Sequence, residues 1–177
     1  MRHYPEGALL AHSLGYVGRI NDREIKKIDP EQYRGTDFIG KIGLEKYYEN
    51  ILLGQVGTEQ VETDARGRVM RILDKKDPVP GSNLTIYLDT ELQRIAAEAL
   101  KGERGALVAM DVNTGGILSM VSTPSYDPNL FTSGISQKQY DGLLNSPDRP
   151  LFNRALRGQY PPGSTVKPLF GLIGLQH

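Results

Sequence analysis

The stretch ALVAMDVNTGGILSMV, residues 106–121, decides the fold of this chain. Two apolar runs of strand length, 106–110 and 117–121, flank a connection rich in Asn and Gly, the residues that tight reversals favour. The pattern predicts a β-hairpin that is buried on at least one face. Upstream, we interpret the apolar run LTIYL at 84–88 as a further strand of the same sheet.

Helical patterns accompany these strands, so the sequence predicts an α+β fold. Thr90 and Gln93 match a capping box, which opens a helix with four apolar residues on one face: Leu92, Ile95, Ala96 and Ala99. Residues 43–53 predict a second helix, and Gly54 supplies its end. Residues 56–73 alternate loosely like strands, with a hairpin turn at Gly67.

A concentration of helix and strand breakers, DPVPGSN at 77–83, is typical of a domain linker. We place a boundary there, which gives one domain at 1–82 and a second at 83–177. The second contains 122–162, a stretch with six prolines that we expect to be mostly loop, with a short helix near 137–144. Loops of that length usually serve a site or a partner.

Composition argues against several classes of function. The 21 Lys and Arg residues balance 21 Asp and Glu residues, so the chain lacks the basic excess that nucleic-acid binding demands. There is no Cys, and the histidines His3, His12 and His177 are too scattered for a metal site. We therefore expect no nucleic-acid partner, no metal and no cofactor.

Hydropathy predicts neither a membrane span nor a signal peptide within the chain. No run approaches about 18 consecutive apolar residues, the length that a spanning helix needs. Met1 leads into Arg-His-Tyr-Pro, not into the charged and then apolar segments of a signal peptide.

The motif with the clearest chemistry is PPGSTVKP at 161–168. Ser164 follows a Pro-Gly turn at the start of an apolar run that we expect to be a helix, 169–175. Lys167, three residues on, lies on the same helical face and could take the proton of the serine hydroxyl. The helix N-terminus favours the negative charge that develops on the serine. Ser164 is thus a candidate nucleophile and Lys167 its candidate base.

Pro168 constrains the start of this helix. In a regular α-helix its ring would crowd the carbonyl of Ser164, four residues earlier. A 3₁₀ opening would avoid the clash and still keep Ser164 and Lys167 together. The competing interpretation is that Ser164 only caps a helix and Lys167 is a solvated charge, because Ser-x-x-Lys alone is a weak signal.

The residues around the motif match a known family. Residues 153–168, NRALRGQYPPGSTVKP, resemble the first active-site motif of the class B penicillin-binding proteins, and 109–129 are similar to the strand pair and loop that precede it there. Residues 2–18 and 40–57 look like the family's non-catalytic, dimerisation-like pedestal. The resemblance is greatest to the elongation-specific members. These blocks stand in the family's order, so they outweigh the helix-cap interpretation.

The resemblance implies a D,D-transpeptidase that cross-links peptidoglycan in cell-wall elongation. Ser164 would attack a stem peptide ending in D-Ala-D-Ala, Lys167 would act as general base, and an amine of a second stem would resolve the acyl-enzyme. β-Lactams would acylate the same serine. The likeness also implies a membrane glycosyltransferase and a periplasmic scaffold as partners, at the periplasmic face of the bacterial inner membrane.

Parts of the family pattern do not occur in the sequence. No Ser-x-Asn motif and no Lys-Thr-Gly strand follow Lys167, and the family's membrane anchor does not precede Arg2. We therefore expect part of a pedestal, then the N-terminal portion of a penicillin-binding, serine β-lactamase-like transpeptidase domain. We also expect the 177-residue chain by itself to be inactive.

Three other functions stay open. The chain could be a partner-binding pedestal module of the same protein. It could also be a Ser-x-x-Lys β-lactamase or D,D-carboxypeptidase, although those enzymes lack the block at 40–57. The last is a Ser/Lys amidase on an unrelated fold, in which the hairpin at 106–121 has no place.

Overall fold

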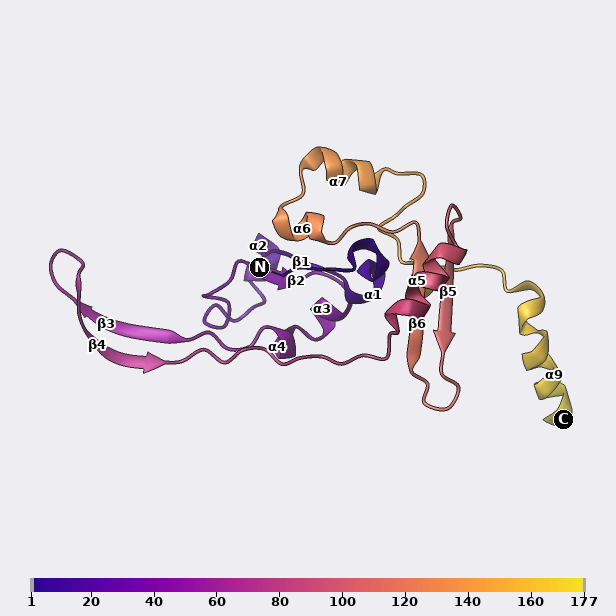
Figure 1. Cartoon of the computed structure of the whole chain (residues 1–177), viewed down its shortest axis with the longest axis horizontal. Helices are drawn as coiled ribbons and strands as arrows, with labels where there is room; N and C mark the ends of the chain where they lie inside the picture. The colour runs from indigo at the N-terminus through magenta and orange to yellow at the C-terminus, as the bar shows by residue number, and fades with distance from the viewer. Residues whose placement is uncertain (1, 177) are drawn as a thin grey trace.

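The computed structural model describes residues 2–176, so Met1 and His177 lie outside the described residues. Helices and strands are mixed, which confirms the α+β prediction. The described strands pair into two-stranded antiparallel sheets: β1 (Val17–Arg19) with β2 (Phe38–Gly40), β3 (Thr58–Thr63) with β4 (Val69–Lys76), and β5 (Gly105–Met110) with β6 (Ile117–Thr123). Figure 1 shows a central body, with the β3–β4 hairpin projecting at one end and α9 (Lys167–Gln176) at the other.

The β5–β6 hairpin confirms the strand pair predicted at 106–121. Leu107 pairs with Val121, and the backbone N–H of Asp111 donates to the carbonyl of Gly116 across the turn. Gly115 has a φ of 74°, in the left-handed region where a side chain would be strained. The Asn- and Gly-rich connection therefore makes the reversal that its composition indicates.

The helix α5 (Thr90–Ala99) packs on β6 with Gln93 and Ala96 buried. The predicted helix is confirmed, but its N-cap is Asp89 and not Thr90. The Asp89 carboxylate accepts from the backbone N–H groups of the second and third helical residues. The predicted apolar face is wrong at Ile95, which is 58% exposed, because the buried face of the helix is centred on Gln93 and Ala96.

The predicted strand at 84–88 is wrong. This segment belongs to no described strand; the next residue, Asp89, donates its N–H to the carbonyl of Leu118. Its side chains are half-buried or exposed, and they line a cavity of about 360 Å³ together with Leu44 and Tyr48 of the pedestal half. The apolar run thus marks a half-buried segment, and that signal does not require a strand partner.

The helix predicted at 43–53 forms as two short helices, α3 (Gly43–Tyr47) and α4 (Glu49–Leu52). They are separated at Tyr48, where φ and ψ are −104° and 21°. The break directs Glu49 toward β2, where its carboxylate accepts the backbone N–H of Gly40 at 2.6 Å. Gly54 ends this region with a φ of 75°, as predicted.

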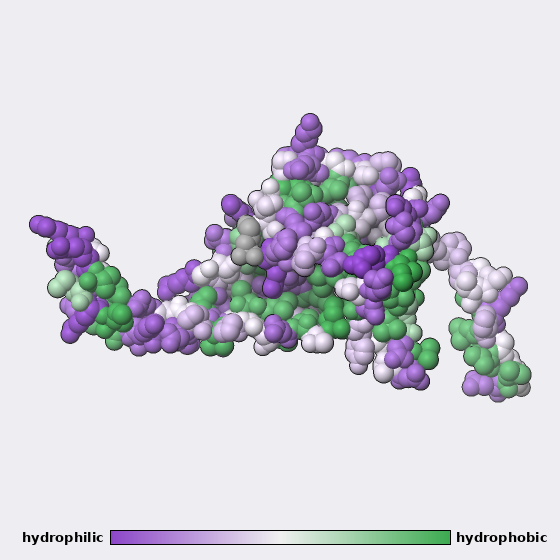
Figure 2. Space-filling view, in the orientation of Figure 1, coloured by the Kyte–Doolittle hydropathy of each residue, from purple (hydrophilic) through white to green (hydrophobic). Residues whose placement is uncertain are grey.

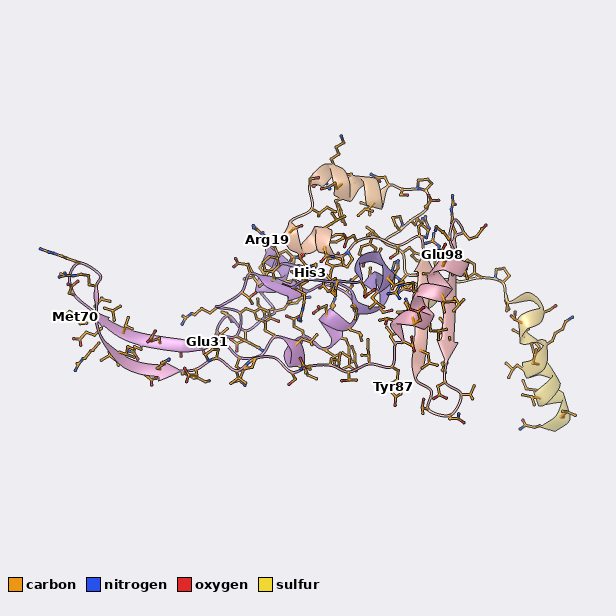
Figure 3. The ribbon with its side chains drawn as sticks, viewed as in Figure 1. His3, Arg19, Glu31, Met70, Tyr87 and Glu98 are labelled. Atoms are coloured by element: carbon orange, nitrogen blue, oxygen red, sulfur yellow. The ribbon has the colours of Figure 1, made fainter. Side chains whose placement is uncertain are left out.

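The β3–β4 hairpin, here called the arm, confirms the strands and the turn predicted at 56–73. Gly67 takes a φ of 76° at the turn, and β4 continues to Lys76. Every residue of β4 is exposed, and Met70 lies on the arm away from the body (Figure 3). The arm therefore contributes little to the core.

The N-terminal segment, residues 4–16, packs into the half of the chain that follows the predicted linker. It holds η1 (Gly7–Leu9) and α1 (Ala11–Leu14), and α2 (Asp22–Ile25) follows it. The Asn129 side chain accepts from the N–H of Tyr4 and donates to its carbonyl, each at 2.9 Å. Buried apolar residues from both halves form the core: Tyr4, Leu10, Ala11, Ala96, Val121 and Tyr126. The boundary at 77–83 stays a prediction, and the two predicted domains share this core.

The proline-rich stretch 122–162 contains the predicted helix as α7 (Gln137–Leu144). It also contains two short helices that sequence analysis missed, α6 (Asn129–Ser133) and α8 (Arg154–Arg157). α6 places Phe131 against Tyr16 of the N-terminal half, with the two rings stacked 4.0 Å apart. The long loop thus helps to hold the two halves together.

Apolar surface is exposed on the arm, on α9 and also on the central body (Figure 2). Among residues 2–176, no helix combines the length and the apolar character that a membrane crossing would require.

Candidate active site: Ser164 and Lys167 on a 3₁₀ turn

Ser164 lies in η2 (Gly163–Val166), a 3₁₀ turn that leads directly into α9. The backbone N–H of Lys167 donates to the carbonyl of Ser164, an i to i+3 bond. In a regular α-helix the N–H of residue 168 would donate to this carbonyl, but Pro168 has no N–H. The i to i+3 bond from Lys167 therefore pairs the Ser164 carbonyl instead. The 3₁₀ opening predicted from Pro168 is confirmed.

The turn is capped by Pro162, whose carbonyl accepts from both the N–H and the hydroxyl of Thr165. Gly163 supports the reversal with a φ of 54°. The side chains of Ser164 and Lys167 are both exposed, and no hydrogen bond joins them among the interactions of the described residues. The structure thus places the two residues on one turn. Their catalytic roles stay a prediction.

The helix α9 confirms the predicted helix at 169–175 and starts two residues earlier, at Lys167. Its apolar side chains lie in the open: Leu169, Phe170, Leu172, Ile173 and Leu175. Figure 1 shows that α9 stands apart from the central body. An exposed apolar helix of this kind is a surface that another element would cover favourably.

A short strap, residues 158–162, connects the turn to the body. Gly158 leaves α8 with an extended ψ of 130°, and the ring of Tyr160 lies so close that a Cβ at Gly158 would sit 2.5 Å from it. Pro161 and Pro162 fix their own φ angles, and such Pro-rich connections behave as semi-rigid spacers. The position of α8 therefore strongly influences where Ser164 lies.

The helix α8 is fixed to β6 and to the N-terminal segment. The Oδ1 of Asn153 caps the helix by accepting from the N–H of Leu156, while its Nδ2 donates to the carbonyl of His12 at 3.0 Å. The N–H of Arg154 donates to the hydroxyl of Ser122 at the end of β6. Asn153 lies within the motif at 153–168, where the sequence alone indicated no role for it, although Asn before a short helix is a recognised capping signal.

Arg154 is buried, and its guanidinium binds the backbone that precedes α8. It donates to the carbonyls of Asp148 and Arg149 at 2.5 and 3.2 Å. Arg149 is the non-glycine residue of the described chain with a positive φ, 48°. The guanidinium of Arg154 therefore holds the strained backbone of Arg149.

His12 lies beneath this segment, with its ring edge-on to Tyr126 at a centroid distance of 5.3 Å. Its Nε2 is buried without a hydrogen-bond partner among the described residues. Burial lowers the pKa of His12, and the charge of Arg154 lowers it further, while the carbonyls of Pro124 and Pro150 act in the opposite direction. Burial therefore disfavours the charged form of His12, and the ring is part of the packing at this junction.

A second cluster of charges lies in the pedestal half, around Glu45. Arg2 pairs with the Glu45 carboxylate at 2.8 Å, and the buried Tyr4 hydroxyl donates to it at 3.1 Å. The same hydroxyl accepts the N–H of Val17. Every polar group of this cluster has a partner, so we assign it to the fold and not to chemistry.

The fold and this turn define a class of protein. Residues 1–86 match the model of the penicillin-binding protein dimerisation domain, and residues 105–177 match the model of the penicillin-binding protein transpeptidase domain. The chain therefore belongs to the penicillin-binding proteins, as the resemblance predicted.

Two relatives are similar to nearly the whole chain. The chain is 53% identical to peptidoglycan D,D-transpeptidase MrdA of Acinetobacter baumannii and 48% identical to MrdA of Escherichia coli, over 99% and 98% of its length. It covers 26% and 28% of those proteins, about a quarter of each.

Two solved structures of PBP2 superpose on nearly the whole chain. Pseudomonas aeruginosa PBP2 in complex with WCK 5153 superposes with a TM-score of 0.87 at 52% identity, over 99% of this chain and 35% of that one. Helicobacter pylori PBP2 in complex with MreC superposes at 0.89 with 36% identity, over 99% and 32%.

Proposed function

We propose that this chain carries the nucleophile of a peptidoglycan D,D-transpeptidase, with Ser164 as the acylated residue and Lys167 as its general base. The observation that carries the proposal is the 3₁₀ turn, which sets a serine and a lysine three residues apart at the start of a helix. It occurs within the segment that matches the transpeptidase domain of penicillin-binding proteins. The MrdA relatives support the reaction class by their names.

The chemistry follows from these two groups. Neutral Lys167 takes the proton of the Ser164 hydroxyl as Oγ attacks the carbonyl of the penultimate D-Ala, and a tetrahedral oxyanion forms. Collapse of this intermediate breaks the amide bond, and the terminal D-Ala leaves with a proton on its amine. The acyl group then passes from Ser164 to an amine of a second stem, which releases the serine. A β-lactam follows the first half of this path, with its ring amide as the bond that breaks.

Electrostatics favour Ser164 as the site of attack. It lies in the turn that opens α9, where the helix dipole stabilises negative charge. In a closed active site this dipole would act in a dry environment, where it is worth more than in water. The exposed apolar side chains of α9 are suited to such a covered position.

The site of action and the partners extend this proposal. A stem-peptide substrate exists outside the cytoplasmic membrane, so we place the enzyme at the periplasmic face of the bacterial inner membrane, in cell-wall elongation and the maintenance of cell shape. A membrane glycosyltransferase that makes glycan strands is the expected partner. A scaffold is also expected, since the Helicobacter pylori PBP2 has been solved with MreC.

The test is labelling of the full-length protein with a fluorescent penicillin, followed by peptide mass mapping. The adduct is expected on Ser164, and Ser164→Ala is expected to abolish it. Ser133→Ala, at the exposed end of α6, serves as the matched control and should label normally. An adduct that persists in Ser164→Ala would overturn the proposal.

The nature of the acceptor separates the transpeptidase from the β-lactamase and carboxypeptidase alternatives. Transfer of the acyl group to an added D-amino acid or amine supports a transpeptidase. Exclusive hydrolysis of the acyl-enzyme would support the alternatives.

A partner-binding role of the pedestal half is the second candidate. Four apolar side chains of the arm are exposed, Val69, Met70, Ile72 and Leu73, which is a surface typical of protein contacts. Binding of MreC to the 177-residue chain, lost on replacement of Ile72 and Leu73 by Ser, would support it. Unchanged binding would place the contact elsewhere on the pedestal.

A further inference from the structure

The strap that carries Ser164 is attached to the body through few residues, and one of them contacts the N-terminal segment directly. Asn153 uses both ends of its side chain: Oδ1 caps α8, and Nδ2 donates to the backbone carbonyl of His12, 141 residues earlier. The ring of His12 is buried against Tyr126. α1 of the N-terminal half therefore holds the base of the strap through the backbone of His12.

Other contacts at the base of the strap come from two buried residues, Ser122 and Arg154. The hydroxyl of Ser122 accepts the N–H of Arg154 and donates to the carbonyl of Phe152, which joins β6 to the first turn of α8. The guanidinium of Arg154 fixes the carbonyls of Asp148 and Arg149. These bonds set the direction in which α8 points. Both partners of each of these bonds lie in the second half of the chain. The bond of Asn153 differs, because its acceptor, the His12 carbonyl, lies in the first half.

The strap transmits this direction to the nucleophile. Gly158 ends α8 with its N–H on the carbonyl of Arg154, and the two prolines that follow have little rotational freedom. A change in the tilt of α8 therefore moves the Ser164 turn as a unit. Small displacements of this kind matter, since misplacement of a reacting group by about 1 Å can cost roughly a hundredfold in rate.

We infer that Asn153 is a positioning residue of the acylation reaction, and that its bond to the His12 carbonyl lets the N-terminal segment set the position of Ser164. This inference rests on the proposed function and deepens it. The Asn153 side chain makes no contact with Ser164, so it acts through α8 and the strap. The pedestal half thereby becomes part of the machinery that orients the nucleophile.

Substitutions at Asn153 separate the bond to His12 from the helix cap. Asn153→Asp keeps an oxygen that caps α8 equally well but has no N–H for the His12 carbonyl. Asn153→Ala loses both. Asn129→Asp is the matched control, because Asn129 ties the N-terminal segment to α6 through Tyr4 in the same two-bond manner and does not touch the strap.

The measurement is the penicillin acylation of the full-length protein, resolved into the rate constant at saturating penicillin and the dissociation constant of the non-covalent complex. The melting temperature of each variant is recorded in parallel. We expect Asn153→Asp to lower the saturating rate constant roughly ten- to a hundredfold with an unchanged dissociation constant. Asn129→Asp is expected to lower the melting temperature to a similar extent and to acylate at the original rate.

Two results would overturn the inference. A saturating rate constant for Asn153→Asp within twofold of the unsubstituted protein, with only Asn153→Ala slow, would show that the cap matters and the His12 bond does not. Equal losses in Asn153→Asp and Asn129→Asp would indicate a general effect of stability. Both results leave the adduct on Ser164, so they are distinguishable from failure of the proposed function, in which Ser164→Ala still labels.

Discussion

The side chain of Gln93 exchanges two hydrogen bonds with the backbone of Met120: Oε1 accepts the Met120 N–H at 2.8 Å, and Nε2 donates to the Met120 carbonyl at 2.9 Å. The amide also accepts from the Ser119 hydroxyl and donates to the carbonyl of Leu9. One buried side chain thus links α5, β6 and the N-terminal segment, and all four of its hydrogen-bonding positions are used.

Replacing Gln93 by Met should therefore be costly although the volume is preserved. The change removes a partner from the Ser119 hydroxyl, the Met120 N–H and the Leu9 carbonyl, and we expect the free energy of unfolding to fall by about 1–3 kcal/mol. Urea titration followed by circular dichroism measures this. Gln137→Met on exposed α7 is the control, with an expected change below about 0.5 kcal/mol. Similar losses in both variants would contradict the role of Gln93.

Removal of the Tyr4 hydroxyl should destabilise the pedestal half. Burial and the negative Glu45 raise the pKa of Tyr4, so the phenol stays protonated and donates to the Glu45 carboxylate. Tyr4→Phe leaves that carboxylate and the N–H of Val17 short of a partner, and we expect a loss of about 1–3 kcal/mol. Tyr47→Phe provides the comparison, because Tyr47 is 81% exposed and should be neutral to the change. Thermal melts of both variants measure the two losses of stability.

The pH dependence of stability should carry a contribution from His12. Its pKa in the folded protein is lowered by burial, so below the unfolded value of 6.5 the unfolded state takes up the proton first. The contribution is therefore complete above about pH 6.5 and is lost as pH falls toward the folded pKa. His12→Phe keeps the ring contact with Tyr126 and does not titrate. The unfolding free energy of the unsubstituted protein should fall more steeply between pH 7 and pH 5 than that of His12→Phe; parallel curves would contradict this.

Core and arm should respond differently to the same kind of truncation. Val121 is 4% exposed on β6, and Val121→Ala should cost about 1–3 kcal/mol through lost burial and a residual cavity. Ile72 is 54% exposed on the arm, and Ile72→Ala should cost less than about 0.5 kcal/mol although it removes more atoms. Chemical denaturation compares the two. A larger loss at Ile72 would mean that the arm packs against the body.

The proposed role of Lys167 as the general base can be tested by substitution. Arg keeps the positive charge, but a guanidinium cannot accept a proton near neutral pH. Lys167→Arg should therefore slow penicillin acylation by roughly 10²–10⁴-fold, the usual contribution of a general base. Lys138→Arg on α7 should leave the rate unchanged. Normal acylation by Lys167→Arg would remove Lys167 from the mechanism and leave Ser164 in need of another base.

Local patterns predicted the elements whose signals are local. The β5–β6 hairpin, the arm with Gly67 at its turn, and α7 follow from apolar periodicity and turn residues alone. The 3₁₀ opening at Ser164 follows from the ring of Pro168, a steric argument that needs no tertiary structure.

The misses arise where tertiary contacts decide. Residues 84–88 carry a strand-like apolar run, yet they pair with no described strand and instead line a cavity with the pedestal helices. On α5, polar Gln93 occupies the centre of the buried face and apolar Ile95 lies outside, because Gln93 satisfies backbone groups of two other elements. The contact between Asn153 and His12 spans 141 residues, and no periodicity within one window can reveal it.

The core that the N-terminal segment shares with the second half has a consequence for synthesis. Residues 4–16 leave the ribosome well before their partners: Tyr4 binds Asn129, 125 residues further on, and His12 binds Asn153, 141 residues further on. Domains usually fold as units in the order in which they are made. Here residues 4–16 gain these contacts only after Asn129 and Asn153 have been made, so a nascent chain holds an unfilled apolar surface over that interval. A chaperone that shields residues 4–16 during that interval would favour the native fold.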